Sequence, residues 1–252
     1  MVSLKSITRQ GKALFLAYDH GLEHGPDELA EFSGRALDPR FVLQIARQGR
    51  YNALVLQQGI AEKYYPPAQQ KVPLIVKLNG KTELVGGEAV SRQVCSVKDA
   101  KRLGAKAVGY TLYAGSQHES IMFAEFGRIV SQAHRLKLPA IAWVYPRGKK
   151  IKDENSAETI EYAARIGLEM GADIVKIKYC SARGAFERAV KAAGKTKVML
   201  AGGPKTTSRE FLRAVQRVMQ AGAIGLVVGR NVWQAKEPLR LTREIKKIIF
   251  PK

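Results

Sequence analysis

Two lysines stand two positions apart in a short apolar segment, as Lys176 and Lys178 within residues 174–178. Side chains two positions apart in a strand share one face, so both amines lie together if this segment is extended. Burial and a neighbouring like charge both lower the pKa of a lysine, and the resulting neutral amine can attack a carbonyl to form a Schiff base. Two adjacent lysines are equally suited to binding a phosphate group. The pair alone favours neither the Schiff-base interpretation nor the phosphate-binding interpretation.

Two glycine-containing turns predict an anion site. Gly202 and Gly203 follow one apolar run, and Gly229 and Arg230 follow the next. Glycine turns leave backbone N–H groups free, and a helix that starts there adds the positive end of its dipole. The guanidinium of Arg230 adds a charged fork that suits a phosphate. Tight turns without a ligand are the alternative interpretation.

The elements that must position these residues follow a repeating pattern. Eight short, continuous apolar runs alternate with helical segments, at residues 13–17, 53–56, 74–78, 107–111, 140–144, 174–178, 198–201 and 224–228. Continuous apolar runs are typical of parallel strands that helices cover. Eight such units predict a (β/α)8 TIM barrel, and no compositional break divides residues 1–252, so we expect a single domain. Only the second unit is weak, because Pro66 and Pro67 interrupt its helical segment.

Further polar residues follow the predicted strands, where a barrel places its active site. Asp19 follows the first strand, Lys77 lies at the end of the third, and Trp143, Tyr145 and Arg147 mark the end of the fifth. Asp19 is also suited to capping a helix, and the two aromatic residues to filling the core. Their place at polar strand ends favours a functional interpretation.

The histidines give little support for a metal site. His20 and His24 lie near Asp19, but three ligands in one loop without a supporting cluster are weak evidence for zinc. His118 and His134 fit ordinary helix positions. We therefore expect no metal.

Composition excludes several classes of protein. The net charge is +20, from 42 basic and 22 acidic residues, but the basic residues are dispersed and no nucleic-acid motif accompanies them. This favours a solvated basic surface that partly helps to attract phosphorylated substrates, with a basic nucleic-acid-binding barrel as the non-enzymatic alternative. The two cysteines fit neither a disulfide framework nor a metal site. Neither a membrane-spanning run nor a signal peptide is evident, so we expect no membrane association and a cytoplasmic location.

Seven segments, in the same order along the chain, resemble the archaeal-type class I fructose-1,6-bisphosphate aldolases. They are residues 17–26, 59–65, 77–82, 145–148, 175–179, 202–206 and 228–234. The resemblance implies reversible cleavage of fructose 1,6-bisphosphate to dihydroxyacetone phosphate and glyceraldehyde 3-phosphate, without a metal or other cofactor. It also implies a homo-oligomer, a decamer of two pentameric rings.

The resemblance assigns roles to individual residues. Lys176 is expected to form the Schiff base, Tyr145 to shuttle protons, Asp19 to assist imine formation, and Trp143 to line the site. Phosphate binding is expected at Gly202, Gly203, Gly229 and Arg230, and we expect further substrate contacts from His24, Lys77, Arg147 and Lys178.

Two departures from the family pattern lie near the site. Residues 180–182 are Cys-Ser-Ala where the family usually has Thr-Gly-Asp, and Ala201 stands where a serine commonly precedes the two glycines. The alternative enzyme in the same superfamily is a 2-amino-3,7-dideoxy-D-threo-hept-6-ulosonate synthase, which uses an equivalent lysine, tyrosine and aspartate. The segments at Glu23–His24 and residues 77–81 are closer to the bisphosphate aldolases.

Overall fold

The computed structural model describes residues 2–31, 34–66 and 71–251, and in it eight parallel strands close into a barrel. Around the barrel the strand order is β1-β10-β9-β8-β7-β6-β3-β2. The strands are β1 Ala13–Tyr18, β2 Ala53–Gln57, β3 Leu74–Lys77, β6 Ala107–Leu112, β7 Ala140–Val144, β8 Ile174–Ile177, β9 Lys197–Ala201 and β10 Gly225–Val228. The predicted (β/α)8 fold is confirmed.

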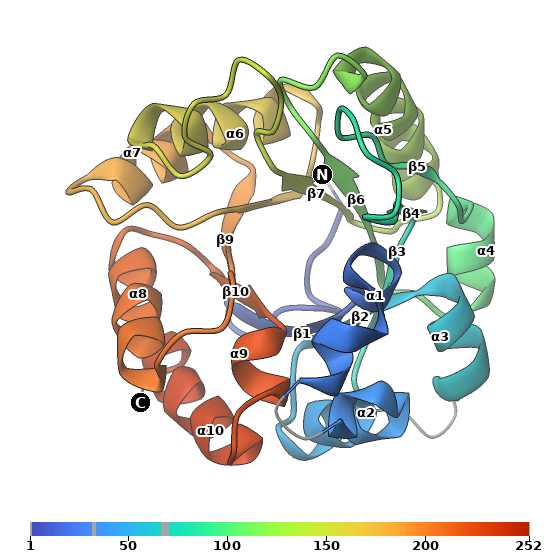
Figure 1. The fold of residues 1–252 in the computed structure, drawn as a ribbon, viewed down its shortest axis with the longest axis vertical. Helices are drawn as coiled ribbons and strands as arrows, with labels where there is room; N and C mark the ends of the chain where they lie inside the picture. The colour runs from blue at the N-terminus through green and yellow to red at the C-terminus, as the bar shows by residue number, and fades with distance from the viewer. Residues whose placement is uncertain (1, 32–33, 67–70, 252) are drawn as a thin grey trace.

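The helices are α1 Gly21–Ala30, α2 Pro39–Gln48, α3 Gln58–Tyr64, α4 Val97–Arg102, α5 Glu119–Arg135, α6 Ala157–Glu169, α7 Ala185–Ala192, α8 Ser208–Gln220, α9 Arg230–Trp233 and α10 Pro238–Ile249, with a 3-10 turn η1 at Arg35–Leu37. Most of them form an outer ring around the strands, and Figure 1 shows the short helices α1 and α9 inside that ring. Ser96, Ser156 and Thr207 cap α4, α6 and α8, because each hydroxyl accepts an N–H from the first turn of its helix.

Side chains alternate between two apolar clusters, because successive residues of a strand face opposite sides. In β1, Leu14 and Leu16 pack outward against the helices, while Phe15 packs into the barrel interior. The interior cluster also contains Ile75, Ile141, Ile174 and Val227, and Ile7, which precedes β1, belongs to it as well. The same alternation places Lys77 of β3 and Lys176 of β8 on the interior face, near the carboxyl end of the barrel. It also places Asp19 and Tyr145, one residue beyond β1 and β7, on that face.

The differences from the predicted elements are small. The third and sixth strands end one residue earlier than predicted, at Lys77 and Ile177. The second unit does contain a helix, α3, which ends at Tyr64 before the two prolines; Pro67 lies outside the described residues. A short antiparallel ladder of β4 Asn79–Gly80 and β5 Arg92–Gln93 was not predicted.

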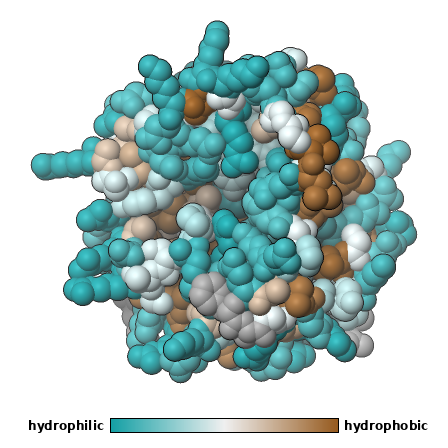
Figure 2. Space-filling view, in the orientation of Figure 1, coloured by the Kyte–Doolittle hydropathy of each residue, from teal (hydrophilic) through white to brown (hydrophobic). Residues whose placement is uncertain are grey.

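The outer surface is mostly hydrophilic on the face seen along the barrel (Figure 2). Within the described part of the chain, each helix is too short or too polar to cross a bilayer.

Candidate active site

A cavity of about 1030 Å³ opens at the carboxyl ends of the barrel strands. Every residue predicted for catalysis or binding lines it: Asp19, His24, Lys77, Trp143, Tyr145, Arg147, Lys176, Lys178, Gly202, Gly203, Gly229 and Arg230. These residues come from the ends of six strands or from the segments that follow them. The structure thus brings the predicted set into one space, while their individual roles stay predictions.

Lys176 is a buried amine between two aromatic rings. Its side chain is 6% exposed, and its Nζ lies 5.3 Å from the ring centre of Trp143 and 5.7 Å from that of Tyr145. Burial and the charge of Lys77 together lower the pKa of Lys176 to about 8, although Asp19 raises it. A substantial fraction of this amine is therefore neutral near pH 8, as a nucleophile requires.

Asp19 is the carboxylate of this part of the site. Burial raises its pKa, but the neighbouring His20, Lys77 and Lys176 outweigh burial and hold the pKa below its ordinary value. Asp19 therefore stays ionised at neutral pH. An ionised carboxylate near a lysine can orient substrate hydroxyl groups and accept protons from them.

Tyr145 continues the interior face one position beyond β7. Burial raises the pKa of Tyr145, and the charges of Asp19 and Glu23 raise it further, so the phenol keeps its proton. Trp143, in the layer below, is 1% exposed, and its Nε1 has no partner among the described residues. Trp143 pairs with Lys176 across the β7–β8 register, which fixes the indole beside the amine.

The two glycine loops are held together by a residue that the sequence analysis did not identify. Asn231 is 1% exposed, and its Nδ2 donates to the carbonyl oxygens of Gly202 (2.9 Å) and Pro204 (2.8 Å). Its Oδ1 accepts the N–H of Thr206 at 3.1 Å. The position directly after Gly229 and Arg230 was the available signal, but the sequence gives no partner for the amide.

One expectation about these loops was wrong. The N–H of Gly202 is not free, because it donates to the carbonyl oxygen of Val227 at 2.8 Å. Glycine is needed here for packing instead, since a Cβ would lie 3.0 Å from the Cα of Val228.

Arg230 is positioned by a long-range ion pair. Its Nη1 donates to Oε1 of Glu28, in α1, at 2.5 Å. Its Nε is buried without a partner among the described residues. An unpaired buried donor is costly, so this edge of the guanidinium is suited to an anion in the cavity.

The two lysines of the Lys-Ile-Lys segment have different surroundings. Lys178 lies just beyond β8, is 26% exposed and donates to Oε2 of Glu154. Oε1 of the same carboxylate accepts from Nε of Arg147 at 3.2 Å. Glu154 therefore joins two cations at the rim, whereas Lys176 lies deeper without such a bridge. Lys176 and Lys178 are therefore not two equivalent lysines placed to bind one phosphate group.

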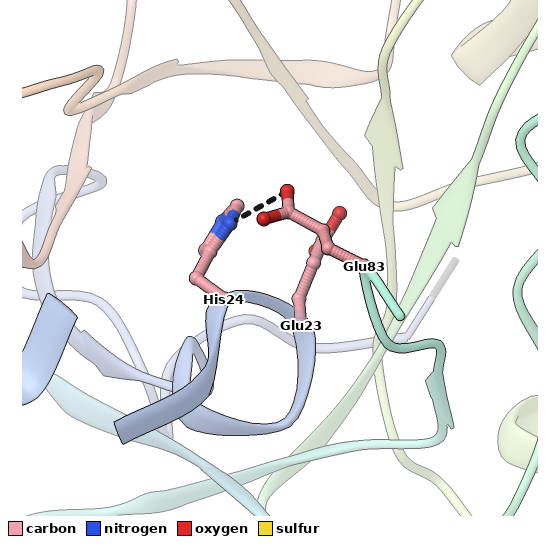
Figure 3. Close-up of side chains that lie close together, drawn as sticks. All are labelled: Glu23, His24 and Glu83. Carbon is pink, nitrogen blue, oxygen red and sulfur yellow. Dashed lines mark hydrogen bonds and ion pairs between the residues drawn. The ribbon is translucent and has the colours of Figure 1, made fainter. Parts of the chain in front are cut away.

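Among the described residues one cluster has ligand types that a metal ion could use, and it differs from the loop of Asp19, His20 and His24 that the sequence analysis considered as weak evidence for zinc. Glu23 and His24 of α1 face Glu83, which lies in the loop between β4 and β5 (Figure 3). One possible ligand atom from each of the three side chains lies within 4.8 Å of the other two. Nδ1 of His24 lies 2.9 Å from Oε1 of Glu83.

The surroundings of this cluster oppose a divalent cation. Oε1 of Glu23 already accepts the Tyr113 hydroxyl at 2.7 Å and lies 4.0 Å from Nζ of Lys81 and 3.9 Å from Nη1 of Arg147. Two fixed positive charges this close repel a metal ion. The arrangement fits an ion-paired rim better than a metal centre.

Comparison with known proteins places these observations in a family. Residues 13–235 match the model of the DeoC/LacD family aldolases. The class 1 fructose-bisphosphate aldolase of Thermoproteus tenax is 49% identical over 98% of this chain and 93% of its own length. The corresponding protein of Halobacterium salinarum is 44% identical, over 97% of this chain and 92% of its own.

A solved structure is similar over nearly the whole chain. It is an archaeal fructose-1,6-bisphosphate aldolase whose catalytic lysine is covalently bound to the carbinolamine intermediate of its substrate. That chain is 48% identical to this one and superimposes with a TM-score of 0.93, over 98% of this chain and 97% of its own.

Proposed function

The chain belongs to the DeoC/LacD family of aldolases, and we propose that it is a class I fructose-1,6-bisphosphate aldolase whose Schiff base forms on Lys176. The reaction is the reversible cleavage of fructose 1,6-bisphosphate to dihydroxyacetone phosphate and glyceraldehyde 3-phosphate. The observation that carries the assignment of Lys176 is its burial between Trp143 and Tyr145, with a pKa of about 8, in the cavity that Asp19 also lines.

Imine formation begins with the neutral amine of Lys176. Its nitrogen attacks C2 of the ketose and forms a carbinolamine, and loss of water then gives a protonated imine. Asp19, ionised nearby, orients the hydroxyl groups and exchanges the protons that this dehydration requires. The positive imine is the electron sink for the next step, so the mechanism calls on no metal.

Carbon–carbon cleavage follows from proton removal at the C4 hydroxyl. As that proton passes to the ionised carboxylate of Asp19, the C4 oxygen forms the aldehyde carbonyl and the C3–C4 bonding electrons move into the imine, giving an enamine. After the aldehyde departs, the phenol of Tyr145, which burial keeps protonated, donates its proton to C3, and the proton held on Asp19 then restores the phenol. Hydrolysis of the resulting imine releases dihydroxyacetone phosphate.

We assign one substrate phosphate to the loops that carry Gly203, Gly229 and Arg230. The unpaired Nε of Arg230 supports this position. The other phosphate lies toward the opposite rim, where His24, Arg147 and Lys178 line the cavity. Lys77, deeper in the barrel, acts on the charges of Asp19 and Lys176 and approaches the substrate from β3.

The competing functions have less support. Relatives that are 44–49% identical over nearly the whole chain are named fructose-bisphosphate aldolases, which favours this reaction over the heptulosonate synthase. If the chain were a nucleic-acid-binding barrel, the buried side chains of Lys176, Tyr145 and Asp19 would have no function. One catalytic domain, a cytoplasmic location and a homo-oligomer of two pentameric rings complete the proposal.

The test is cleavage of fructose 1,6-bisphosphate by protein dialysed against a chelator, with glyceraldehyde 3-phosphate measured in a linked assay. Full activity with the chelator, and none for Lys176→Met, is the expected result. Activity that disappears with the chelator and returns with a divalent metal ion would contradict the proposed mechanism and point to the cluster of Glu23, His24 and Glu83.

A further inference from the structure

Glu154 is a carboxylate in contact with two cations of the cavity rim, and the mechanism above gives it no role. It belongs to the loop between β7 and α6, and its side chain is 30% exposed. Arg147 and Lys178 line the cavity, whereas Glu154 does not. The carboxylate therefore contacts both cations without occupying the space in which a ligand would meet them.

Each oxygen of Glu154 accepts from a different cation. Nε of Arg147 donates to Oε1 at 3.2 Å, and Nζ of Lys178 donates to Oε2. A guanidinium and an ammonium each carry several N–H donors, so both cations keep donors for a ligand. Two cations held close together repel each other, and the shared carboxylate offsets this repulsion. Without it, the two side chains would separate.

Each cation also lies over an aromatic ring. The guanidinium carbon of Arg147 is 5.2 Å from the ring centre of Tyr113, and Nζ of Lys178 is 6.0 Å from that of Tyr145. Cations within about 6 Å of a ring centre are attracted to its face. The Tyr113 ring is itself fixed, because its hydroxyl donates to Oε1 of Glu23 at 2.7 Å. Two rings and one carboxylate thus hold the pair of cations in place.

The loop that carries Glu154 is fixed against the segment after β6. Arg147 donates its backbone N–H to the carbonyl oxygen of Ala114 at 2.7 Å. At Gly148 a Cβ would lie 1.9 Å from the carbonyl oxygen of Gly115, so glycine is needed for this close approach of two backbone segments. This packing limits how far the loop, and with it Glu154, can move.

We infer that Glu154 is a positioning residue that makes the enzyme selective for a ketose with two phosphate groups. It holds Arg147 and Lys178 together as one pair of donors for the phosphate at C6 of the substrate. This rests on the proposed function and deepens it, because it names a group on which discrimination between bisphosphate and monophosphate ketoses depends. The C1 phosphate, beside Gly203 and Arg230, is common to both ketoses and does not require Glu154.

The test compares cleavage of fructose 1,6-bisphosphate with cleavage of fructose 1-phosphate, which lacks only the C6 phosphate. Both ketoses give dihydroxyacetone phosphate, so one linked assay measures kcat and KM for each. The variants are Glu154→Ala and Glu154→Gln, with Glu161→Ala as the matched control. Glu161 is an exposed glutamate of α6 that pairs with Arg188 at 3.1 Å and does not line the cavity. Circular dichroism and thermal unfolding establish that each variant is folded.

We expect Glu154→Ala to raise KM for the bisphosphate by about 10-fold and to leave kcat unchanged, as weaker hydrogen bonds to a charged group predict. Glu154→Gln should lose less, because its amide oxygen still accepts from one cation. KM for fructose 1-phosphate should be unchanged in both variants. Glu161→Ala should match the wild type with both substrates.

A second measurement tests whether Glu154 acts through the two cations. In protein that already carries Arg147→Met and Lys178→Met, Glu154→Ala should cause no further change in kcat/KM for the bisphosphate, because no cation is left for it to position. A further loss there, equal losses for both ketoses in Glu154→Ala, or a lower KM for the bisphosphate in that variant would overturn the inference. Failure of the wild type to cleave either ketose would instead contradict the proposed function itself.

Discussion

Nζ of Lys77 lies 4.0 Å from Oδ2 of Asp19, and the two side chains are only 6% and 9% exposed. Burial lowers the pKa of Lys77, although Asp19 and Glu23 raise it. The charge of Lys77 in turn lowers the pKa of both Asp19 and Lys176. A second lysine on the interior face, from β3, thus helps to keep the Asp19 carboxylate ionised and favours the neutral form of the Lys176 amine.

Replacing Lys77 by methionine should shift the pH dependence of imine formation. The folded-state pKa of Lys176 is depressed to about 8, so the reactive amine is gained as the pH rises through that value. Removing a nearby positive charge favours the protonated form of Lys176 and raises its pKa, so Lys77→Met should move the midpoint of the trapping rate to higher pH.

The matched control is Lys106→Met, an exposed lysine just before β6 at the other end of the barrel. It should leave the midpoint where it is in the wild type. A midpoint for Lys77→Met at or below that of the wild type would show that Lys77 does not tune Lys176.

Replacing Tyr145 by phenylalanine should separate imine formation from bond cleavage. The amine of Lys176 and the carboxylate of Asp19 remain, so dihydroxyacetone phosphate should still be trapped on the protein. Loss of the proton-transfer group should lower kcat for cleavage by about 100-fold or more. Steady-state kinetics and trapping on the same preparation measure both steps, and parallel loss of the two would mean that Tyr145 is needed for the imine itself.

Replacing Asn231 by alanine should weaken substrate binding through the loops that it joins. The variant leaves the carbonyl oxygens of Gly202 and Pro204 without the donors at 2.9 and 2.8 Å. Each lost hydrogen bond is worth about 0.5–1.5 kcal/mol, so the Tm should fall and the loops should separate. KM for fructose 1,6-bisphosphate should rise more than kcat falls, and an unchanged KM would show that the loops do not need this amide.

Replacing Gly109 by alanine should disturb the wall of the site from within the barrel. A Cβ there would lie 1.9 Å from the Trp143 ring, so the indole beside Lys176 must move. Overpacking of this kind destabilises by about 1–3 kcal/mol and should lower activity as well.

Gly127→Ala is the matched control for Gly109→Ala. It lies within α5, where the added Cβ would meet nothing within 4 Å beyond the backbone of its own helix turn. Alanine is the better helix former by about 0.5–1 kcal/mol, so this variant should gain stability in chemical denaturation. Equal behaviour of the two variants would contradict the packing argument.

The sequence predicted the barrel and the positions of Lys176, Asp19 and Tyr145 at the strand ends because both depend on local periodicity, whereas the catalytic roles of these residues rested on the resemblance. A period of two in β8 places Lys176 inside, and strict alternation of strands and helices brings Asp19 and Tyr145 to the same end. Both predictions depend only on residues that are close together in the sequence.

Contacts between distant segments were not predictable in this way. Glu28 and Arg230 are 202 positions apart, and Asn231 joins two loops through backbone atoms that carry no residue-specific signal. The free N–H expected at Gly202 was wrong for the same reason, since its acceptor lies on the neighbouring strand β10. The glycines predicted the turn, but which of their N–H groups lack a hydrogen-bond acceptor depends on how the strands pack in the folded barrel.

The most direct test of the account is borohydride trapping with dihydroxyacetone phosphate in the presence of a chelator, followed by mass mapping of the modified peptide. We predict one stable adduct on Lys176, absent from Lys176→Met and undiminished in Lys178→Met if trapping is done at saturating ketone. No adduct, or modification confined to exposed lysines, would contradict the Schiff-base mechanism.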